Sequence, residues 1–121
     1  MGLEKITHPE IHEKGWGREL WIANSQLYCG KILEVRKDKK CSIHYHKLKD
    51  ETFYILDGKI LIELYPDGYP GNLDTLVMNP GDTIHIPQHL PHRFTGIEDS
   101  RILEISTQHF EEDSYRLLRG D

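Results

Sequence analysis

The segment that decides the fold reads Ser42-Ile43-His44-Tyr45-His46-Lys47-Leu48-Lys49-Asp50-Glu51-Thr52-Phe53. Side chains two apart in a strand point to the same face, so a strand over 42–47 places the imidazoles of His44 and His46 side by side. Residues 47–50 suit a polar turn, after which Glu51 opens the partner strand close to both imidazoles. Two imidazoles and one carboxylate from one hairpin are the ligands that a divalent transition metal needs on one side.

A second segment offers a fourth ligand. It reads Gly81-Asp82-Thr83-Ile84-His85-Ile86-Pro87-Gln88-His89-Leu90-Pro91-His92-Arg93-Phe94, which predicts a strand, a turn and a second strand. His92 opens the second strand and is the candidate, with His85 and His89 as rivals for the role.

Length and composition limit what the chain can be. It has 121 residues and a mass of 14.2 kDa, which predicts one domain. The net charge of −5 argues against a nucleic-acid partner. No run of about 18 apolar residues predicts a membrane span, and residues 1–7 lack the apolar core of a signal peptide. We therefore expect a cytoplasmic protein whose two cysteines, Cys29 and Cys41, are reduced.

Short apolar stretches between frequent turn residues predict an all-β sandwich or barrel. The expected strands are 19–23, 27–36, 42–47, 51–57, 59–65, 74–78, 82–87, 91–95 and 101–106. The dipeptide Asp57–Gly58 predicts a tight type I′ hairpin. Only 111–119 has the features of a short helix. We divide the single domain into an arm (1–14), a barrel (15–107) and a tail (108–121).

These two segments resemble the motifs of the cupin superfamily. The first motif, Gly-x₅-His-x-His-x₃₋₄-Glu-x₆-Gly, is matched by His44, His46, Glu51 and Gly58, with Asp38 in place of the first glycine. In the second motif, Gly-x₅-Pro-x-Gly-x₂-His-x₃-Asn, the matching residues are Gly81, Pro87 and His92, whereas His89 and Gly96 replace its internal glycine and its asparagine.

The resemblance implies a jelly-roll (double-stranded β-helix) barrel. It also implies that His44, His46, Glu51 and His92 hold one divalent transition metal, for which Zn, Mn, Fe, Ni and Co are all chemically acceptable. Residues 14–19, Lys-Gly-Trp-Gly-Arg-Glu, resemble the opening segment of cupins similar to mannose-6-phosphate isomerase, with Gly15 in place of a proline. This finer resemblance implies a small-molecule substrate, a sugar or a sugar phosphate.

Aldose–ketose isomerisation needs a base and a group that stabilises the enediolate. The candidate catalytic residues are His85 and Glu104, with Tyr65 and Lys31 as further possibilities, and the candidate substrate-binding residues are Lys49, His89 and Arg93. The same ligands would also serve an Fe(II)-dependent dioxygenase, and a non-catalytic sugar-binding cupin in polysaccharide or nucleotide-sugar metabolism is a third hypothesis. Because edge strands need covering, we expect a homodimer.

Overall fold

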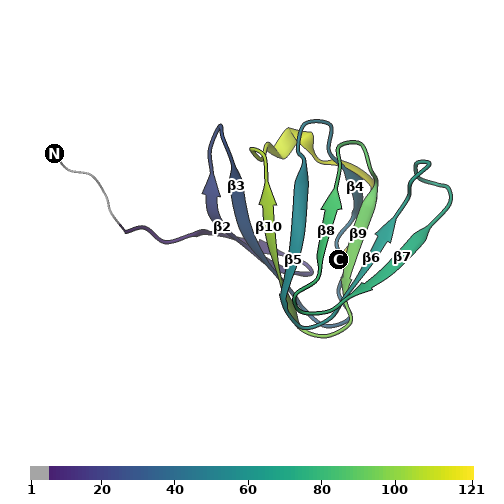
Figure 1. Cartoon of the computed structure of the whole chain (residues 1–121), viewed down its shortest axis with the longest axis horizontal. Helices are drawn as coiled ribbons and strands as arrows, with labels where there is room; N and C mark the ends of the chain where they lie inside the picture. Colours follow the sequence, from purple (N-terminus) through teal and green to yellow (C-terminus); the bar gives the residue numbers. More distant parts are fainter. Residues whose placement is uncertain (1–5) are drawn as a thin grey trace.

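The computed structural model describes residues 6–121 and shows two antiparallel sheets, which confirms the predicted all-β jelly roll (Figure 1). The six-stranded sheet has the order β1 (Glu10–Lys14), β2 (Gly17–Asn24), β3 (Cys29–Val35), β10 (Ser100–Ser106), β5 (Glu51–Asp57) and β8 (Thr83–Ile86). The five-stranded sheet has the order β11 (Tyr115–Leu118), β4 (Ile43–Tyr45), β9 (His92–Gly96), β6 (Ile60–Leu64) and β7 (Asp74–Met78). All nine predicted strands are present.

The chain passes repeatedly from one sheet to the other. Strands β4, β6 and β9 lie in the five-stranded sheet, and β5, β8 and β10 lie in the six-stranded sheet. The turn at Asp57–Gly58 therefore joins strands of different sheets, and the hairpin prediction was wrong. Gly58 does adopt the expected positive φ of 85°, and a Cβ there would lie 2.1 Å from Ser100 Oγ, so glycine permits this close approach.

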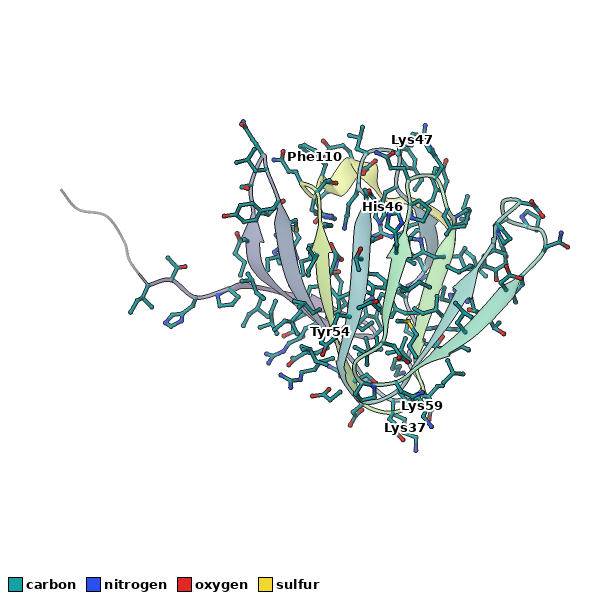
Figure 2. The ribbon with its side chains drawn as sticks, viewed as in Figure 1. Lys37, His46, Lys47, Tyr54, Lys59 and Phe110 are labelled. Atoms are coloured by element: carbon teal, nitrogen blue, oxygen red, sulfur yellow. The ribbon has the colours of Figure 1, made fainter. Side chains whose placement is uncertain are left out.

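The apolar core lies between the two sheets. Its members are buried and include Trp16, Leu33, Val35, Phe53, Ile55, Ile60, Ile62, Met78, Ile86, Phe94 and Ile102. By residue parity, Phe53 and Ile55 share the inner face with Glu51, and Phe94 shares it with His92; all three apolar side chains are buried. Trp16 packs edge-on against Phe94, with ring centroids 5.0 Å apart. His46 lies toward the opposite end of the barrel from Lys37 and Lys59 (Figure 2).

Both ends of the chain differ from the expectation. Of the arm, residues 1–5 lie outside the described residues, and 10–14 form β1, which pairs with β2. The expected helix over 111–119 is a 3₁₀ turn at Glu111–Asp113 followed by β11, which pairs with β4. An isolated nine-residue helix is marginal in water, whereas the open edge of β4 offers a full set of backbone partners. No helix in residues 6–121 is long and apolar enough to cross a membrane.

Candidate metal centre and cavity

Three histidines meet between the sheets. His44 in β4 and His92 in β9 are cross-strand neighbours, and His46 follows directly after β4. One ring nitrogen from each of the three lies within 4.8 Å of the other two. The two-residue period of β4 therefore places His44 and His46 on one side, as the sequence predicts, and the pairing with β9 brings His92 to them.

Backbone hydrogen bonds orient all three imidazoles. Each Nδ1 contacts a backbone carbonyl oxygen, namely that of Ser42 for His44 (3.0 Å), of Asp113 for His46 (3.0 Å) and of Leu90 for His92 (2.8 Å). A carbonyl oxygen only accepts, so each Nδ1 carries the hydrogen and each Nε2 presents a lone pair. Metal-binding histidines are oriented in the same way by a partner on the other ring nitrogen.

Glu51 reaches the histidines from the opposite sheet, at the first residue of β5. Its Oε2 lies 3.4 Å from Nε2 of His46 and 3.4 Å from Nε2 of His92. Within the described residues, Glu51 Oε2 and His92 Nε2 are buried and accept or donate no hydrogen bond. Donor atoms around a metal with bonds of about 2.1 Å lie roughly 3.0–3.5 Å apart. The unsatisfied atoms and their spacing fit a divalent transition metal.

The protonation states also suit a metal. Burial, together with His92 and His46, lowers the pKa of His44 well below its usual value, and burial lowers the pKa of His46 to about 4. Burial alone would raise the pKa of Glu51, but contacts with His92 and Lys49 outweigh it and hold the pKa well below the usual range. Neutral imidazoles and an ionised carboxylate are the forms that bind a metal.

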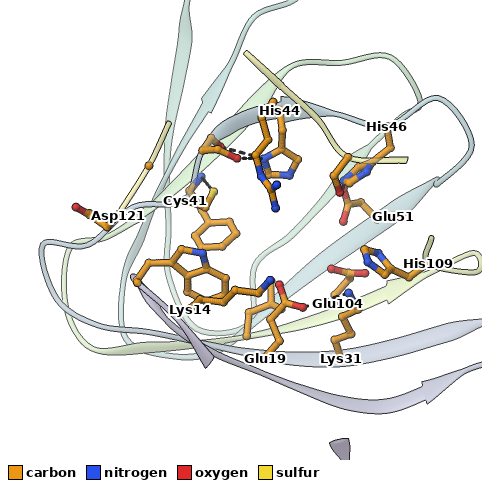
Figure 3. A pocket seen from close by; sticks show the side chains of 18 of the residues that line it. Lys14, Glu19, Lys31, Cys41, His44, His46, Glu51, Glu104, His109 and Asp121 are labelled. Atoms are coloured by element: carbon orange, nitrogen blue, oxygen red, sulfur yellow. Dashed lines mark hydrogen bonds and ion pairs between the residues drawn. The ribbon is translucent and has the colours of Figure 1, made fainter. Parts of the chain in front are cut away.

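The candidate metal centre opens into a cavity of about 540 Å³, which His44, His46 and Glu51 line. Figure 3 shows Glu104, Lys31 and Glu19 across the cavity from His44. The Lys49 Nζ donates to Glu104 Oε2 at 3.0 Å and lies 3.9 Å from Glu51 Oε1. One buried ammonium group therefore connects the candidate metal centre to a second buried carboxylate.

Glu104 is a buried carboxyl group beside Lys49. Burial raises the pKa of Glu104, although Lys49 acts against this. The two hydrogen bonds that Glu104 accepts within the described residues, from Lys49 Nζ and Ser106 Oγ, both reach Oε2. Its other oxygen, Oε1, is thus available for a proton. The predicted catalytic residue Glu104 therefore lies in the cavity, and the Lys49 side chain contacts both Glu104 and Glu51.

A second buried lysine lies on the same wall. Lys31 is 1% exposed, and its Nζ lies 3.3 Å from Glu19 Oε1 and 4.3 Å from the centre of the Trp21 ring. Lys31 and Glu104 are cross-strand neighbours in β3 and β10, both facing inward. Lys49, predicted as a substrate contact, lines the cavity but is already paired with Glu104.

Two predicted site residues lie outside the cavity. In β8, Ile84 and Ile86 face the core, so His85 points outward, where it is exposed and pairs with Asp50. His89 lies exposed in the connection between β8 and β9 at a φ of 70°, and its backbone N–H donates to the carbonyl oxygen of His46. His85 therefore does not reach the cavity and cannot act there as a base. His89 contacts the site through its backbone N–H and not through its imidazole.

Arg93, predicted to contact the substrate, instead binds two backbone carbonyl oxygens. It follows His92 in β9 and points to the opposite side of the strand from the cavity. Its Nε donates to the carbonyl oxygen of Cys41 at 2.8 Å, and its Nη2 donates to that of Arg119 at 3.0 Å. A guanidinium group that is 6% exposed and bonded in this way ties the C-terminal segment to the barrel. Tyr65 is likewise not among the residues that line the cavity.

Asp113 is a residue beside the site that sequence reasoning missed. Asp113 is 2% exposed and contacts both His46 and the segment after it. In the sequence it ends the acidic run Glu111-Glu112-Asp113, which we interpreted as the start of a helix. No local pattern distinguishes this aspartate from its two exposed neighbours.

Comparison with known families agrees with this geometry. Residues 31–106 match the model of the cupin domain, and they include all four candidate ligands. The chain is a cupin. Among curated proteins, this cupin is 35% identical over 51 residues to quercetin 2,3-dioxygenase of Bacillus subtilis (strain 168). That match spans 42% of this cupin and 13% of the longer dioxygenase.

Solved structures share the fold. KdgF from Halomonas sp. superposes with a TM-score of 0.72 at 17% sequence identity, covering 85% of this cupin and 91% of that chain. CapF, the capsular polysaccharide assembling protein of Staphylococcus aureus, superposes with a TM-score of 0.78 at 15% identity, covering 93% of this cupin and 33% of that chain. At these identities the likeness shows the cupin fold alone.

Proposed function

We propose that this cupin is a metal-dependent enzyme that transfers protons on a sugar or sugar phosphate, in an aldose–ketose isomerase or epimerase reaction. His44, His46, Glu51 and His92 would hold one divalent transition metal. The observation that carries the proposal is the pair Lys49–Glu104, which lies buried in the same cavity as the candidate ligands. A metal site beside a carboxyl group of raised pKa supplies both an electrophile and a base.

In the proposed reaction, Glu104 and Lys49 have separate roles. A bound divalent cation would polarise the carbonyl and hydroxyl oxygens of the substrate. Glu104 Oε1 takes the proton from the carbon next to the carbonyl, and the C–H electron pair forms the carbon–carbon double bond of an enediolate. The same carboxyl group returns the proton to the neighbouring carbon while a hydroxyl proton moves between the two substrate oxygens. Lys49 remains charged, because Glu104 and Glu51 raise its pKa against burial, which would lower it.

The cavity suits a small polar substrate. Its volume of about 540 Å³ lies within the range of small-molecule sites, roughly 300–1,000 Å³. Charged side chains of both signs line it, among them Lys31 and Glu19 on one wall and Arg116 and Arg119 on the C-terminal segment. Such a lining offers donors and acceptors to a polyhydroxy compound, and its cations offer partners to a phosphate.

Solvent isotope exchange tests the proposal. Metal-loaded protein is incubated in D₂O with a panel of aldose and ketose phosphates, and carbon-bound deuterium is measured by NMR. The wild type should incorporate deuterium, and Glu104→Gln should lose about 10²–10⁴-fold of the rate while retaining its metal. Glu98→Gln, an exposed carboxylate away from the cavity, is the matched control and should be unchanged. Absence of exchange across the panel would refute the isomerase proposal.

The match to a quercetin dioxygenase favours a second candidate, an Fe(II)-dependent oxygenase. The same ligands would serve such an enzyme, because non-haem Fe(II) in oxygenases is held by histidine and carboxylate ligands that leave coordination positions open. Oxygen uptake with Fe(II) and enediol or flavonol substrates separates the two functions. A protein that binds sugars tightly but neither exchanges deuterium nor consumes oxygen would instead be a non-catalytic sugar-binding cupin.

We further propose that a second copy of the chain covers the outer face of the six-stranded sheet. The strand register aligns apolar side chains across this face, in the row Ile11, Leu20, Ile32, Leu103 and Tyr54. Ile11 and Ile105 are more than half exposed there, at 53% and 57%. Contiguous exposed apolar surface of this kind marks interaction sites, and a homodimer would bury it.

A further inference from the structure

Asp113 binds the backbone of the segment that connects β4 to β5. It ends the 3₁₀ turn Glu111–Asp113 and is almost fully buried. Its Oδ1 accepts from the N–H of Lys47 at 2.9 Å and of Leu48 at 3.0 Å, and its Oδ2 accepts from the N–H of Lys49 at 3.0 Å. Three consecutive amides thus converge on one carboxylate, which makes strong charge-assisted hydrogen bonds.

The segment held in this way joins two candidate ligands. His46 immediately precedes residues 47–49, and Glu51 follows them after one intervening residue. The segment also carries Lys49, the partner of Glu104. Figure 2 shows His46 and Lys47 at the same end of the barrel as Phe110, which precedes the 3₁₀ turn. A carboxylate from the C-terminal segment therefore determines the path of the chain between His46 and Glu51.

The backbone of Asp113 acts on His46 directly. Its carbonyl oxygen accepts from His46 Nδ1 at 3.0 Å, which sets both the tautomer and the ring orientation. His44 and His92 find the equivalent acceptor two residues away in their own segments, at Ser42 and Leu90. Only His46, of these three, depends on a residue far along the chain.

We propose that Asp113 is a positioning residue for the candidate metal centre, acting on His46 and on the backbone of residues 47–49 without touching the metal. The inference rests on the proposed metal-binding function. Partners of this kind are worth roughly 10–100-fold in metal affinity when they are removed. A residue that only stabilised the turn would change the melting temperature and leave the bound metal's surroundings as they are.

Cobalt(II) titration of the full chain tests the proposal, with visible absorption reporting affinity and ligand geometry. Asp113→Ala should bind Co²⁺ roughly 10–100-fold more weakly than wild type and shift the absorption bands, because the ligand set is less well held. Asp113→Asn retains one acceptor oxygen and should lie between the two, which keeps the test decisive if the alanine variant does not fold. Glu112→Gln, the exposed neighbour in the same turn, is the matched control and should behave as wild type.

A second readout needs no metal. In an imidazole ¹H–¹⁵N spectrum of the metal-free protein, wild-type His46 should be the Nδ1–H tautomer. The Asp113 variants keep the backbone carbonyl oxygen but lose the carboxylate that fixes the turn against residues 47–49, so this oxygen is less well placed and the variants should show a mixture of tautomers. Wild-type affinity and band positions in both Asp113 variants would overturn the inference. If wild-type protein binds no Co²⁺, the metal proposal fails, and the His46 spectrum still decides the positioning role: an unchanged tautomer in the variants overturns it, and a mixture supports it.

Discussion

At the residue scale, the candidate metal centre contains two buried atoms, Glu51 Oε2 and His92 Nε2, that lack a hydrogen-bond partner among the described residues. Each imidazole uses Nδ1 to bind a carbonyl oxygen, and Glu51 Oε2 accepts no hydrogen bond within the described residues. A buried polar atom without a partner costs about 1–3 kcal/mol, and more when it is charged. A divalent metal bound by all four groups at once would offset that cost.

One residue outside the ligand set has a pH dependence that can be measured. Burial, with Lys49 and Lys31 nearby, lowers the pKa of His109 to about 4. An unfolded histidine titrates near 6.5, so below that pH the unfolded chain binds the extra proton and the folded chain does not. The stability contribution of neutral His109 is therefore complete above about pH 6.5 and is lost as the pH falls through about 4.

Urea unfolding of metal-free protein between pH 7 and pH 4 measures this effect. Between pH 7 and pH 4, the unfolding free energy of His109→Gln should fall by at least about 1 kcal/mol less than that of the wild type. His8→Gln, in the exposed N-terminal segment, provides the control. Equal slopes for wild type and His109→Gln would contradict the effect of burial on this pKa.

At the element scale, the C-terminal segment is part of the barrel. Strand β11 pairs with β4, and Arg93 in β9 donates to the carbonyl oxygens of Cys41 and Arg119. The backbone N–H of Asp121 also donates to the carbonyl oxygen of Lys40 at 2.8 Å. A Cβ on Gly15 would lie 2.3 Å from the carbonyl carbon of Asp121, so the opening segment of the barrel also packs closely on the chain end.

Arg93→Lys tests how much this anchoring contributes. A lysine cannot donate to both carbonyl oxygens in the fixed geometry of a guanidinium group, so the variant should lose about 1–3 kcal/mol of unfolding free energy. Arg36→Lys, an exposed position, should change it by less than about 0.5 kcal/mol. If Arg93 contacts substrate instead, Arg93→Lys should keep full stability and weaken substrate binding.

Local patterns predicted the strands well, and long-range placement less well. The alternation around His44 and His46 is a property of any strand. The same rule, applied to Ile84 and Ile86, places His85 on the outer face, as the structure does, so the choice of His85 as a catalytic candidate went against the local pattern. The turn residues Asp57 and Gly58 indicate that the chain turns, but they do not indicate which sheet receives the next strand. The role of Asp113 depends on contacts with residues 64–67 positions earlier, which no local pattern encodes.

At the scale of the whole molecule, the two faces of the six-stranded sheet have different roles. The inner face carries Glu51, Glu104 and Lys31 into the cavity, and the outer face presents apolar side chains. The two sets alternate along the same strands, so one sheet supports the cavity on one side and the proposed contact with a second copy on the other.

Multi-angle light scattering tests the homodimer. The wild type should have about twice the chain mass of 14.2 kDa. Ile105→Glu, which places a charge on the outer face, should shift the mass toward that of one chain. Leu76→Glu, at an exposed position of the other sheet, should leave the wild-type mass unchanged. A wild-type mass equal to that of a single chain would refute the homodimer.

The most direct test of the central claim is the metal stoichiometry of the four candidate ligands. Purified protein, stripped with a chelator, is titrated with Co²⁺ and with Zn²⁺, and bound metal is measured by absorption and elemental analysis. We expect one ion per chain in the wild type. In Glu51→Gln and in His92→Gln the metal affinity should fall by more than about 100-fold, which exceeds the effect of removing a residue that only orients a ligand. Saturation at one ion per chain in those two variants with wild-type affinity, or no saturable binding by the wild type, would contradict the central claim.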